Sequence, residues 1–285
     1  MTDEIRNIII TALKEDVGSG DITTLATIPG NIQGKGIFLV KDEGIIAGFE
    51  VVEEVFKTVD KNLVFLKNLR DGYSVKDGDI AAIVEGPAAS ILIAERTALN
   101  FFQRMSGVAT MAHKFRELVR HTNVKIIDTR KTVPGLRAID KQAVKLGGCD
   151  NHRLGLYDMF LIKDNHIAVA GSITKAVKAC IEYRNKLNGK FLIEVETKDL
   201  IEVNEASHSG ADIIMLDNFD VGEMGLAVKL INGRCKVEAS GGVNLYTVKD
   251  IAETGVDFIS VGALTHSVKA LDISLNVELN RTNAR

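Results

Sequence analysis

Positive charge gathers in one stretch of this 285-residue chain, between Asp128 and His166. The stretch holds seven lysines and arginines against five aspartates, a net charge of +2, whereas the whole chain carries −3. The seven are Arg130, Lys131, Arg137, Lys141, Lys145, Arg153 and Lys163. Planar guanidinium groups suit bidentate binding of carboxylates or phosphates. Several of them in one place indicate a site for a multiply anionic ligand.

Three parts of this stretch follow apolar runs or lie in glycine-flanked loops. Arg130 and Lys131 come directly after the run KIID, His152-Arg153 lies in a loop, and Lys163 ends the run MFLI. Charges there are costly to bury unless an opposite charge compensates, so they indicate either an anion site, which we favour, or internal salt bridges with the five aspartates. Lys141 and Lys145 are spaced four apart and predict a solvated helix face.

Acidic residues follow the next apolar runs. Glu194 and Glu196 alternate along one run and so face the same side, and Asp217 and Glu238 lie in the two runs after it. Carboxylates beside a basic cluster can coordinate Mg²⁺ through water or accept hydrogen bonds from sugar hydroxyls. For Glu194 and Glu238 a structural pairing with Lys163 or Arg153 is an equally good interpretation.

Two glycine-containing turns follow the last two runs. Ser240-Gly241-Gly242 comes after KVEAS, and Gly262 comes after DFISV. Glycine lets backbone N–H groups approach an anion closely, and the last strands of α/β barrels are where phosphate commonly binds. The two turns predict a phosphate site.

The elements that must position these residues follow from the apolar pattern. Six short apolar runs begin near residues 125, 159, 191, 212, 236 and 257, with amphipathic segments between them. Alternating strands and helices predict parallel βα units with functional residues at the carboxyl ends of the strands. Because a full barrel has eight units, we expect a six-stranded incomplete α/β (TIM-like) barrel, with an open doubly wound sheet as the alternative.

The first third of the chain has a different pattern. Helical spacing predicts a helix over 4–17, and short β-like runs between 34 and 94, with a helix over 50–59, predict a small α+β unit. A long helical pattern covers 93–120, and we expect Gly107 to divide it at a domain boundary.

Composition limits the classes of partner. No stretch reaches the ~18 consecutive apolar residues of a membrane helix, and Asp3 and Glu4 do not fit a secretory signal, so we expect a cytoplasmic protein. A pI near 6.1 and the absence of tryptophan disfavour nucleic acid as a partner. The three cysteines, Cys149, Cys180 and Cys235, are widely spaced and predict buried, reduced thiols.

Several of these motifs occur together in one known family. The stretch DTRKTVPGLRAIDKQAVKLGGCDNHRLGLYDMFLIKDNH, with ERTALNFFQRMSGVAT, IEVET, IIMLDN, EASGGVN and ISVGALTHSVKALDISL, closely resembles the quinolinate phosphoribosyltransferase family. The resemblance runs over essentially the whole chain. It implies an N-terminal α+β sandwich domain, here 1–108, and a six-stranded barrel, here 109–266, with the segment 267–285 packing back on the sandwich domain.

The resemblance also implies an activity. The family transfers phosphoribosyl from phosphoribosyl pyrophosphate to quinolinate, with decarboxylation, giving nicotinate mononucleotide, pyrophosphate and CO₂ on the pathway to NAD. Mg²⁺ is implied and no organic cofactor. A homodimer, or a higher assembly of dimers with shared active sites, is also implied.

Site residues follow by similarity. Arg130, His152, Arg153 and Lys163 would hold the two quinolinate carboxylates, with Arg96 contributed by a neighbouring subunit. Lys131 and Lys163 would face the pyrophosphate, and Glu196 and Asp217 the ribose hydroxyls and Mg²⁺. Ser240, Gly241, Gly242, Gly262 and His266 would bind the 5-phosphate.

Three other functions remain as alternatives. A paralogue could use another pyridine or a different acceptor, since one altered contact would leave every motif intact. A Schiff-base barrel aldolase would use Lys163 as nucleophile, but Arg130 and Arg153 suit dianion binding more than a desolvated amine. A non-catalytic anion-binding barrel would need neither the acidic residues nor the full basic set.

Overall fold

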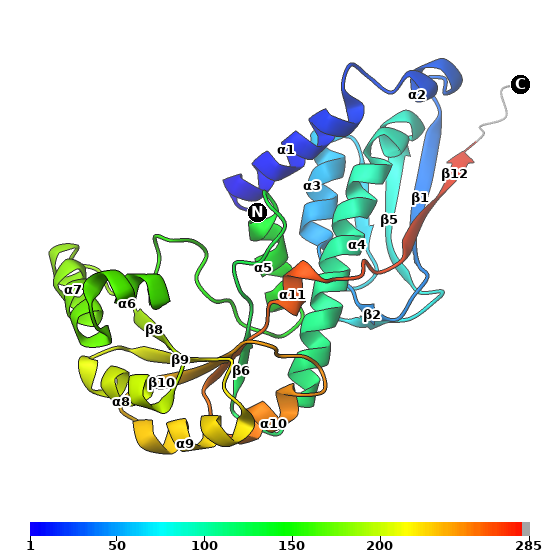
Figure 1. Ribbon diagram of the computed structural model, residues 1–285. Coiled ribbons are helices and arrows are strands. Elements are labelled where there is room, and N and C mark those ends of the chain that lie inside the picture. Colours follow the sequence, from blue (N-terminus) through cyan, green and yellow to red (C-terminus); the bar gives the residue numbers. More distant parts are fainter. Residues whose placement is uncertain (281–285) are drawn as a thin grey trace, which may run out of the picture. The chain divides into compact units, whose positions relative to one another are not determined.

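The computed structural model describes residues 1–280, and the chain forms two compact units (Figure 1). The first unit comprises residues 1–113, 133–148 and the C-terminal segment from Ser267, and the second comprises Lys114–Thr132 and Cys149–His266. Among the described residues, no helix combines the length and the apolar character that a membrane crossing requires.

A four-stranded antiparallel sheet organises the first unit, in the order β12-β1-β5-β3. Its strands are β1 (Gln33–Val40), β3 (Val64–Lys67), β5 (Ile80–Pro87) and β12 (Ile273–Asn280). A second small sheet pairs β2 (Gly44–Ile45) with β4 (Ser74–Val75). The C-terminal segment therefore belongs to the first sheet through β12, and residues 281–285 lie outside the described part of the chain.

Within the described residues, the first unit also contains five helices. They are α1 (Asp3–Val17), α2 (Ile22–Thr27), α3 (Phe49–Val59), most of α4 (Ala88–Leu118) and α5 (Arg137–Leu146). Alternate residues of β1 are buried, and Phe38 of that strand contacts Phe56 of α3 and Phe102 of α4 edge to face, with ring centroids 5.9 and 5.7 Å apart. Phenylalanine rings thus join the sheet and helix layers of an α+β sandwich.

The helix α4 runs through Gly107 without interruption, so the prediction that this glycine divides the helix is wrong. A side chain at position 107 would overlap the carbonyl oxygen of Lys269 and crowd Val268. The glycine is explained by the close approach of segment 268–270 to the helix. The sequence offers no local sign of such a contact.

Residues 133–148 cluster with the first unit, although the expected barrel range of 109–266 included them. Asp140 of α5 is fully buried and accepts two hydrogen bonds from Arg104 of α4, at 2.8 and 2.7 Å. Lys141 is also buried, with 1% of its surface exposed, which corrects the prediction of a solvated face there; Lys145 is exposed. This bidentate ion pair joins α5 to α4 and explains why residues 133–148 cluster with the first unit.

All six apolar runs form strands of one parallel sheet in the second unit. The strands are β6 (Lys125–Ile127), β7 (Phe160–Ile162), β8 (Ile193–Thr197), β9 (Ile213–Asp217), β10 (Lys236–Ser240) and β11 (Phe258–Ser260). The connecting helices are α6 (Asp164–Ala170), α7 (Ile173–Lys186), α8 (Leu200–Ser209), α9 (Val221–Ile231), α10 (Val248–Glu253) and α11 (Ala263–His266).

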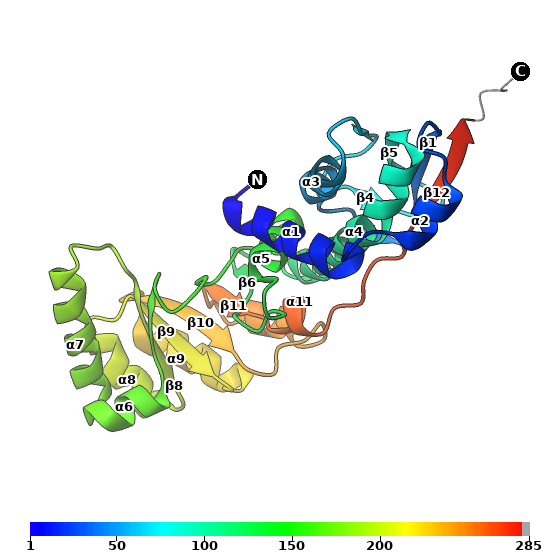
Figure 2. The same ribbon diagram turned by 90° about the horizontal axis from the view of Figure 1, so that it is seen from above.

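The strand order is β6-β11-β10-β9-β8-β7. From β7 to β11, each strand lies next to the one before it in the chain, always on the same side, and β6 pairs with β11. In a doubly wound sheet the side on which strands are added would change at the centre of the sheet. Helices α7 to α10 pack side by side along the sheet (Figures 1 and 2). The expected six-stranded incomplete α/β barrel is confirmed, with its opening between β6 and β7.

Candidate active site

A cavity of about 310 Å³ lies in the second unit, where the carboxyl ends of its strands meet. It is lined by Thr129, Arg130, Lys131, His152, Arg153, Leu161, Lys163, Glu196, Met215, Asp217, Glu238, Ser240 and Ser260. Most of these residues lie at strand ends or directly after them, because side chains there point beyond the hydrogen-bonded sheet. The cavity gathers four cationic and three acidic side chains around two apolar ones.

Three of the four cations have no ionic partner within residues 1–280. Arg130, Lys131 and Arg153 make no ion pair with any carboxylate within 4.0 Å. The Arg153 guanidinium donates through Nη1 to the carbonyl oxygen of Met159 at 3.1 Å, while its Nε is buried without a hydrogen-bond partner. Burial, and then the positive charge of Arg130, lower the pKa of Arg153. Unpaired cations beside an unsatisfied donor form a site that an anion would complete.

Lys163 differs from the other three cations. Its Nζ lies 2.6 Å from Oε2 of Glu196, and its side chain is about half exposed at 48%. Asp217 extends from the adjoining strand β9 and accepts a hydrogen bond from the Asn218 side chain at 2.9 Å. Both acids line the cavity, so it contains two carboxylates on neighbouring strands next to the cations.

The turn after β10 places backbone close to the cavity. Gly241 has φ +94°, and a Cβ there would overlap the side chain of Asn218, while Gly242 has φ +62°. Asn218 is itself left-handed at φ +60° and donates its N–H to the carbonyl oxygen of Ser240 at 2.9 Å. Gly241 is therefore required by both backbone conformation and close packing, and Gly242 by backbone conformation.

The turn after β11 brings three predicted residues together. A Cβ at Gly262 would lie 3.0 Å from Cδ2 of His266 and 3.1 Å from Cδ of Lys131. The hydroxyl of Thr265 donates to the carbonyl oxygen of Lys131 at 2.9 Å. The absence of a side chain at Gly262 allows His266 and Lys131 to approach each other at this edge of the site.

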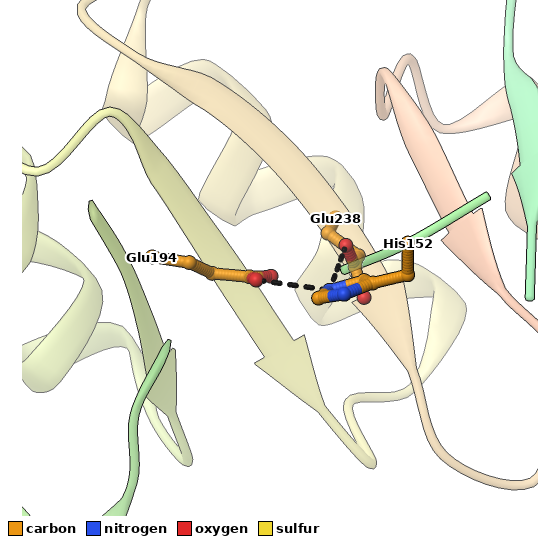
Figure 3. Close-up of side chains that lie close together, drawn as sticks. All are labelled: His152, Glu194 and Glu238. Carbon is orange, nitrogen blue, oxygen red and sulfur yellow. Dashed lines mark hydrogen bonds and ion pairs between the residues drawn. The ribbon is translucent and has the colours of Figure 1, made fainter. Parts of the chain in front are cut away.

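His152, which lines the cavity, contacts two buried glutamates (Figure 3). Its Nε2 lies 3.0 Å from Oε2 of Glu194 on β8 and 3.5 Å from Oε2 of Glu238 on β10. Its Nδ1 accepts the backbone N–H of Arg153 at 2.7 Å, and its own backbone N–H donates to Asp128 at 2.9 Å. Because Nδ1 is an acceptor, the network assigns the ring proton to Nε2, which donates to the carboxylates.

Burial governs the protonation of this pair. Glu194 and Glu238 are 0% and 1% exposed. Burial raises the pKa of Glu194 to about 7, and burial together with the charge of Glu194 raises the pKa of Glu238 well above its ordinary value. Two adjacent carboxyls in a dry site cannot both ionise easily, so Glu238 retains its proton more firmly than Glu194 does.

One histidine and two glutamates within 4.8 Å of one another resemble a metal ligand set. A metal on Nε2 would require the ring proton on Nδ1, where it would face the Arg153 N–H. The hydrogen bonds therefore favour a proton and not a metal ion at this cluster.

The chain matches two family profiles along most of its length. Residues 21–106 match the quinolinate phosphoribosyl transferase N-terminal domain, and residues 108–276 match the C-terminal domain of the same family. The chain belongs to the quinolinate phosphoribosyltransferase family. It is therefore a phosphoribosyltransferase, an enzyme of the pentosyltransferase class in NAD biosynthesis.

Relatives and solved structures agree with this family. A quinolinate phosphoribosyltransferase [decarboxylating] of Nicotiana tabacum is 45% identical over 97% of this chain and 83% of its own length. A probable nicotinate-nucleotide pyrophosphorylase [carboxylating] of Bacillus subtilis is 43% identical over 93% of this chain and 91% of its own. The crystal structure of NadC from Streptococcus pyogenes superposes with a TM-score of 0.92 at 37% identity, covering 98% and 99% of the two chains.

The fold brings together most of the site residues predicted for this phosphoribosyltransferase. Eight of them line the cavity: Arg130, Lys131, His152, Arg153, Lys163, Glu196, Asp217 and Ser240. Gly241, Gly242, Gly262 and His266 lie in the two turns described above. Arg96 is an exposed residue of α4 in the first unit and is not among the residues that line the cavity.

A structural pairing with Lys163 or Arg153 is one of two interpretations of Glu194 and Glu238, and no ion pair of this kind occurs among the described residues. Their close partner is His152, from a loop that the sequence does not place. Sequence reasoning also missed four lining residues, Thr129, Leu161, Met215 and Ser260. Ser260 ends β11, and a search for polar residues at every strand end would have found it.

Proposed function

We propose that the cavity of the second unit binds quinolinate and phosphoribosyl pyrophosphate and joins them with loss of CO₂. The products are nicotinate mononucleotide, pyrophosphate and CO₂. One observation carries this assignment: Arg130, Lys131 and Arg153 line one cavity and lack carboxylate partners in the described chain. A pyridine dicarboxylate and a triply phosphorylated sugar are the kinds of anion that such a cavity would stabilise.

The two carboxylates of quinolinate need cations that can reach them together. Arg153 offers its unpartnered Nε, and Arg130 and Lys163 line the same cavity. Both ring nitrogens of His152 are engaged within the protein, so we assign it a place in the wall of the quinolinate site without a direct carboxylate bond. Leu161 and Met215 supply the apolar contact that a planar ring needs.

The transfer step follows from the charges. The quinolinate ring nitrogen forms a bond to the anomeric carbon as the bond from that carbon to the pyrophosphate oxygen breaks, and the pyrophosphate departs with the electron pair. Lys131 and Lys163 stabilise that departing charge, while Glu196 and Asp217 favour the positive charge that develops on the ribose. Preorganised charges of this kind act without reorganisation at the moment of reaction.

Decarboxylation follows from the product of the transfer. The ring nitrogen is now a positive pyridinium, which accepts the electron pair of the breaking carbon–carboxylate bond as CO₂ leaves. A proton then takes the place of the carboxylate on the ring carbon. The pyridinium itself accepts the electrons, so this step requires no organic cofactor. That the enzyme uses no organic cofactor stays a prediction.

The donor set of Glu196 and Asp217 fits Mg²⁺. Both offer carboxylate oxygens, the ligands that this ion prefers, at adjoining strand ends in the cavity. When bound, the ion adds positive charge beside the departing pyrophosphate. Ser240, Gly241, Gly242, Gly262 and His266 are then the candidates for the 5-phosphate, through backbone N–H groups and one imidazole.

The assembly belongs to the same proposal. We infer a homodimer, or an assembly of dimers, in which Arg96 of one protomer reaches the quinolinate bound by its partner. The exposure of Arg96 on α4 is compatible with this role. A cytoplasmic location stays a prediction.

Of the alternative functions, the aldolase is the less favoured. A Schiff-base lysine must lose its proton in a desolvated pocket, whereas Lys163 is half exposed and 2.6 Å from a carboxylate that stabilises its charge. A paralogue that uses another pyridine would keep the same cavity. Substrate tests must separate it from the quinolinate enzyme.

Product analysis tests the proposal. The enzyme is incubated with phosphoribosyl pyrophosphate, Mg²⁺ and either quinolinate or another pyridine, and the nucleotide, pyrophosphate and CO₂ are measured. We expect the three products in equal amounts with quinolinate. Failure to form them, or faster turnover of another pyridine, overturns the assignment.

A further inference from the structure

Two buried glutamates of the second unit have no role in the reaction as described above. Glu194 and Glu238 come from β8 and β10, the two strands on either side of β9, and both side chains meet at His152 (Figure 3). Each keeps one carboxyl oxygen, Oε1, buried without a hydrogen-bond partner. Burial of unsatisfied carboxyl groups destabilises a fold, so their presence calls for a compensating role.

The hydrogen bonds show what the pair holds in place. His152 is fixed at both ring nitrogens, because Glu194 accepts from Nε2 at 3.0 Å and Nδ1 accepts the Arg153 N–H at 2.7 Å. The imidazole therefore connects the buried carboxylates to the backbone of Arg153. Arg153 carries the unpartnered Nε that we assign to a quinolinate carboxylate.

Removal of the Glu194 acceptor would take away the shorter of the two carboxylate contacts of Nε2 and leave the longer contact to Glu238 at 3.5 Å. A turn of the ring toward water, or an exchange of its tautomer, would then lower the free energy. Either change breaks the hydrogen bond from the Arg153 N–H to Nδ1. A small displacement of a substrate-binding group is enough to cost a large factor in rate.

We propose that Glu194 is a positioning residue that acts through His152, with Glu238 as its support, to hold Arg153 in the geometry that binds quinolinate. This rests on the proposed function, whose substrate it concerns. Glu238 contributes a second carboxyl group 3.5 Å from the same Nε2, so that the imidazole faces carboxyl oxygens from both strands. The role needs an acceptor at position 194 more than it needs a full negative charge.

The acceptor requirement separates two substitutions. Glu194→Gln keeps an acceptor of the same shape, and we expect it to retain most of the activity. Glu194→Met keeps the volume and removes the acceptor, and we expect kcat/KM for quinolinate to fall about 10- to 100-fold. The loss should appear as a higher KM for quinolinate with an unchanged KM for phosphoribosyl pyrophosphate, whereas a general loss of folded enzyme would lower the apparent kcat and leave both KM values unchanged.

The exposed pair His121 and Glu253, at 3.3 Å in the same unit, provides a matched control. Glu253→Met removes a histidine partner away from the cavity and should leave both kinetic constants unchanged. In a double-mutant cycle, Glu194→Met should have little further effect once His152→Ala is present, because the glutamate acts through that ring. Additive losses would overturn the proposal.

A measurement on the unaltered enzyme tests the proposal even if a variant does not fold. Nitrogen NMR of histidine-labelled protein should show His152 with its proton on Nε2, and a proton on Nδ1 would overturn the proposal. If the unaltered enzyme does not turn over quinolinate, the proposed function fails. If it does, and Glu194→Met impairs both substrates equally or neither, only the positioning role fails.

Discussion

Substitution of Arg153 is the most informative single change. The buried Arg153 side chain destabilises the free enzyme, whereas in the complex it stabilises bound quinolinate. Its Nε is buried without a partner, and its charge lies beside that of Arg130. An unsatisfied buried donor costs about 1–3 kcal/mol, while the bond from Nη1 to Met159 returns about 0.5–1.5 kcal/mol. Arg153→Met should therefore make the free enzyme between about 0.5 kcal/mol less stable and about 2.5 kcal/mol more stable.

The same substitution should damage catalysis. A hydrogen bond to a charged group is worth about 1.5–3 kcal/mol, so kcat/KM for quinolinate should fall about 10- to 150-fold. Thermal unfolding without ligand should show a Tm that is nearly unchanged or higher by a few degrees, at about 2–4 °C per kcal/mol for a chain of this size. Added quinolinate should raise the Tm of the original enzyme much more than that of the variant.

Arg120→Met is the control, since Arg120 is a mostly exposed residue of the same unit, with 72% of its side chain accessible. It should change neither activity nor Tm by much. If Arg153→Met lowers the Tm by several degrees in the absence of ligand, Arg153 supports the fold and the reasoning from its unpartnered Nε is refuted.

Three further predictions concern the helix α4, a buried thiol and the assembly. Gly107→Ala should lower the free energy of unfolding by about 1–3 kcal/mol, although alanine normally favours a helix, because segment 268–270 leaves no room for Cβ; equal stability in urea would refute the close approach. Burial raises the pKa of Cys149 to about 12, so at pH 8 a thiol reagent should modify it more slowly than the other two cysteines. Because the fold favours the neutral thiol, the contribution of Cys149 to the free energy of unfolding is intact below pH ~9 and is lost as the pH rises toward 12. An equally rapid reaction of all three thiols would contradict this burial. Finally, Arg96→Ala and Lys163→Ala chains, each inactive alone, should regain activity when their subunits exchange, with up to about half of the sites in heterodimers intact; proven exchange without activity would mean that Arg96 does not act across subunits.

The sequence predicts the second unit well because one pattern, an apolar run that ends in polar residues, marks both the strands and the site residues. Each apolar run that ends in polar residues became a parallel strand, and Lys163, Glu196, Asp217 and Ser240 meet because parallel strands end at the same edge. This inference needs only the period of the pattern, so it does not depend on the loops.

The features that sequence reasoning missed depend on contacts between distant segments. Glu194 and Glu238 lie on the strands that their apolar runs predict, but their partner His152 comes from a loop with no periodic signal. Lys141 has helical spacing typical of a solvated face, and only tertiary packing buries it. Gly107 has the local sign of a helix break and is instead a site of close approach.

The ratio of kcat/KM for quinolinate to kcat/KM for nicotinate tests most directly whether the cavity is built for two carboxylates on one ring. Nicotinate lacks one carboxylate and would leave a cation such as Arg153 unpaired in the site, at a cost of about 2–5 kcal/mol. We expect quinolinate to be preferred by about 30- to 5,000-fold, with one CO₂ released for each nucleotide formed. Equal turnover of nicotinate would contradict this expectation.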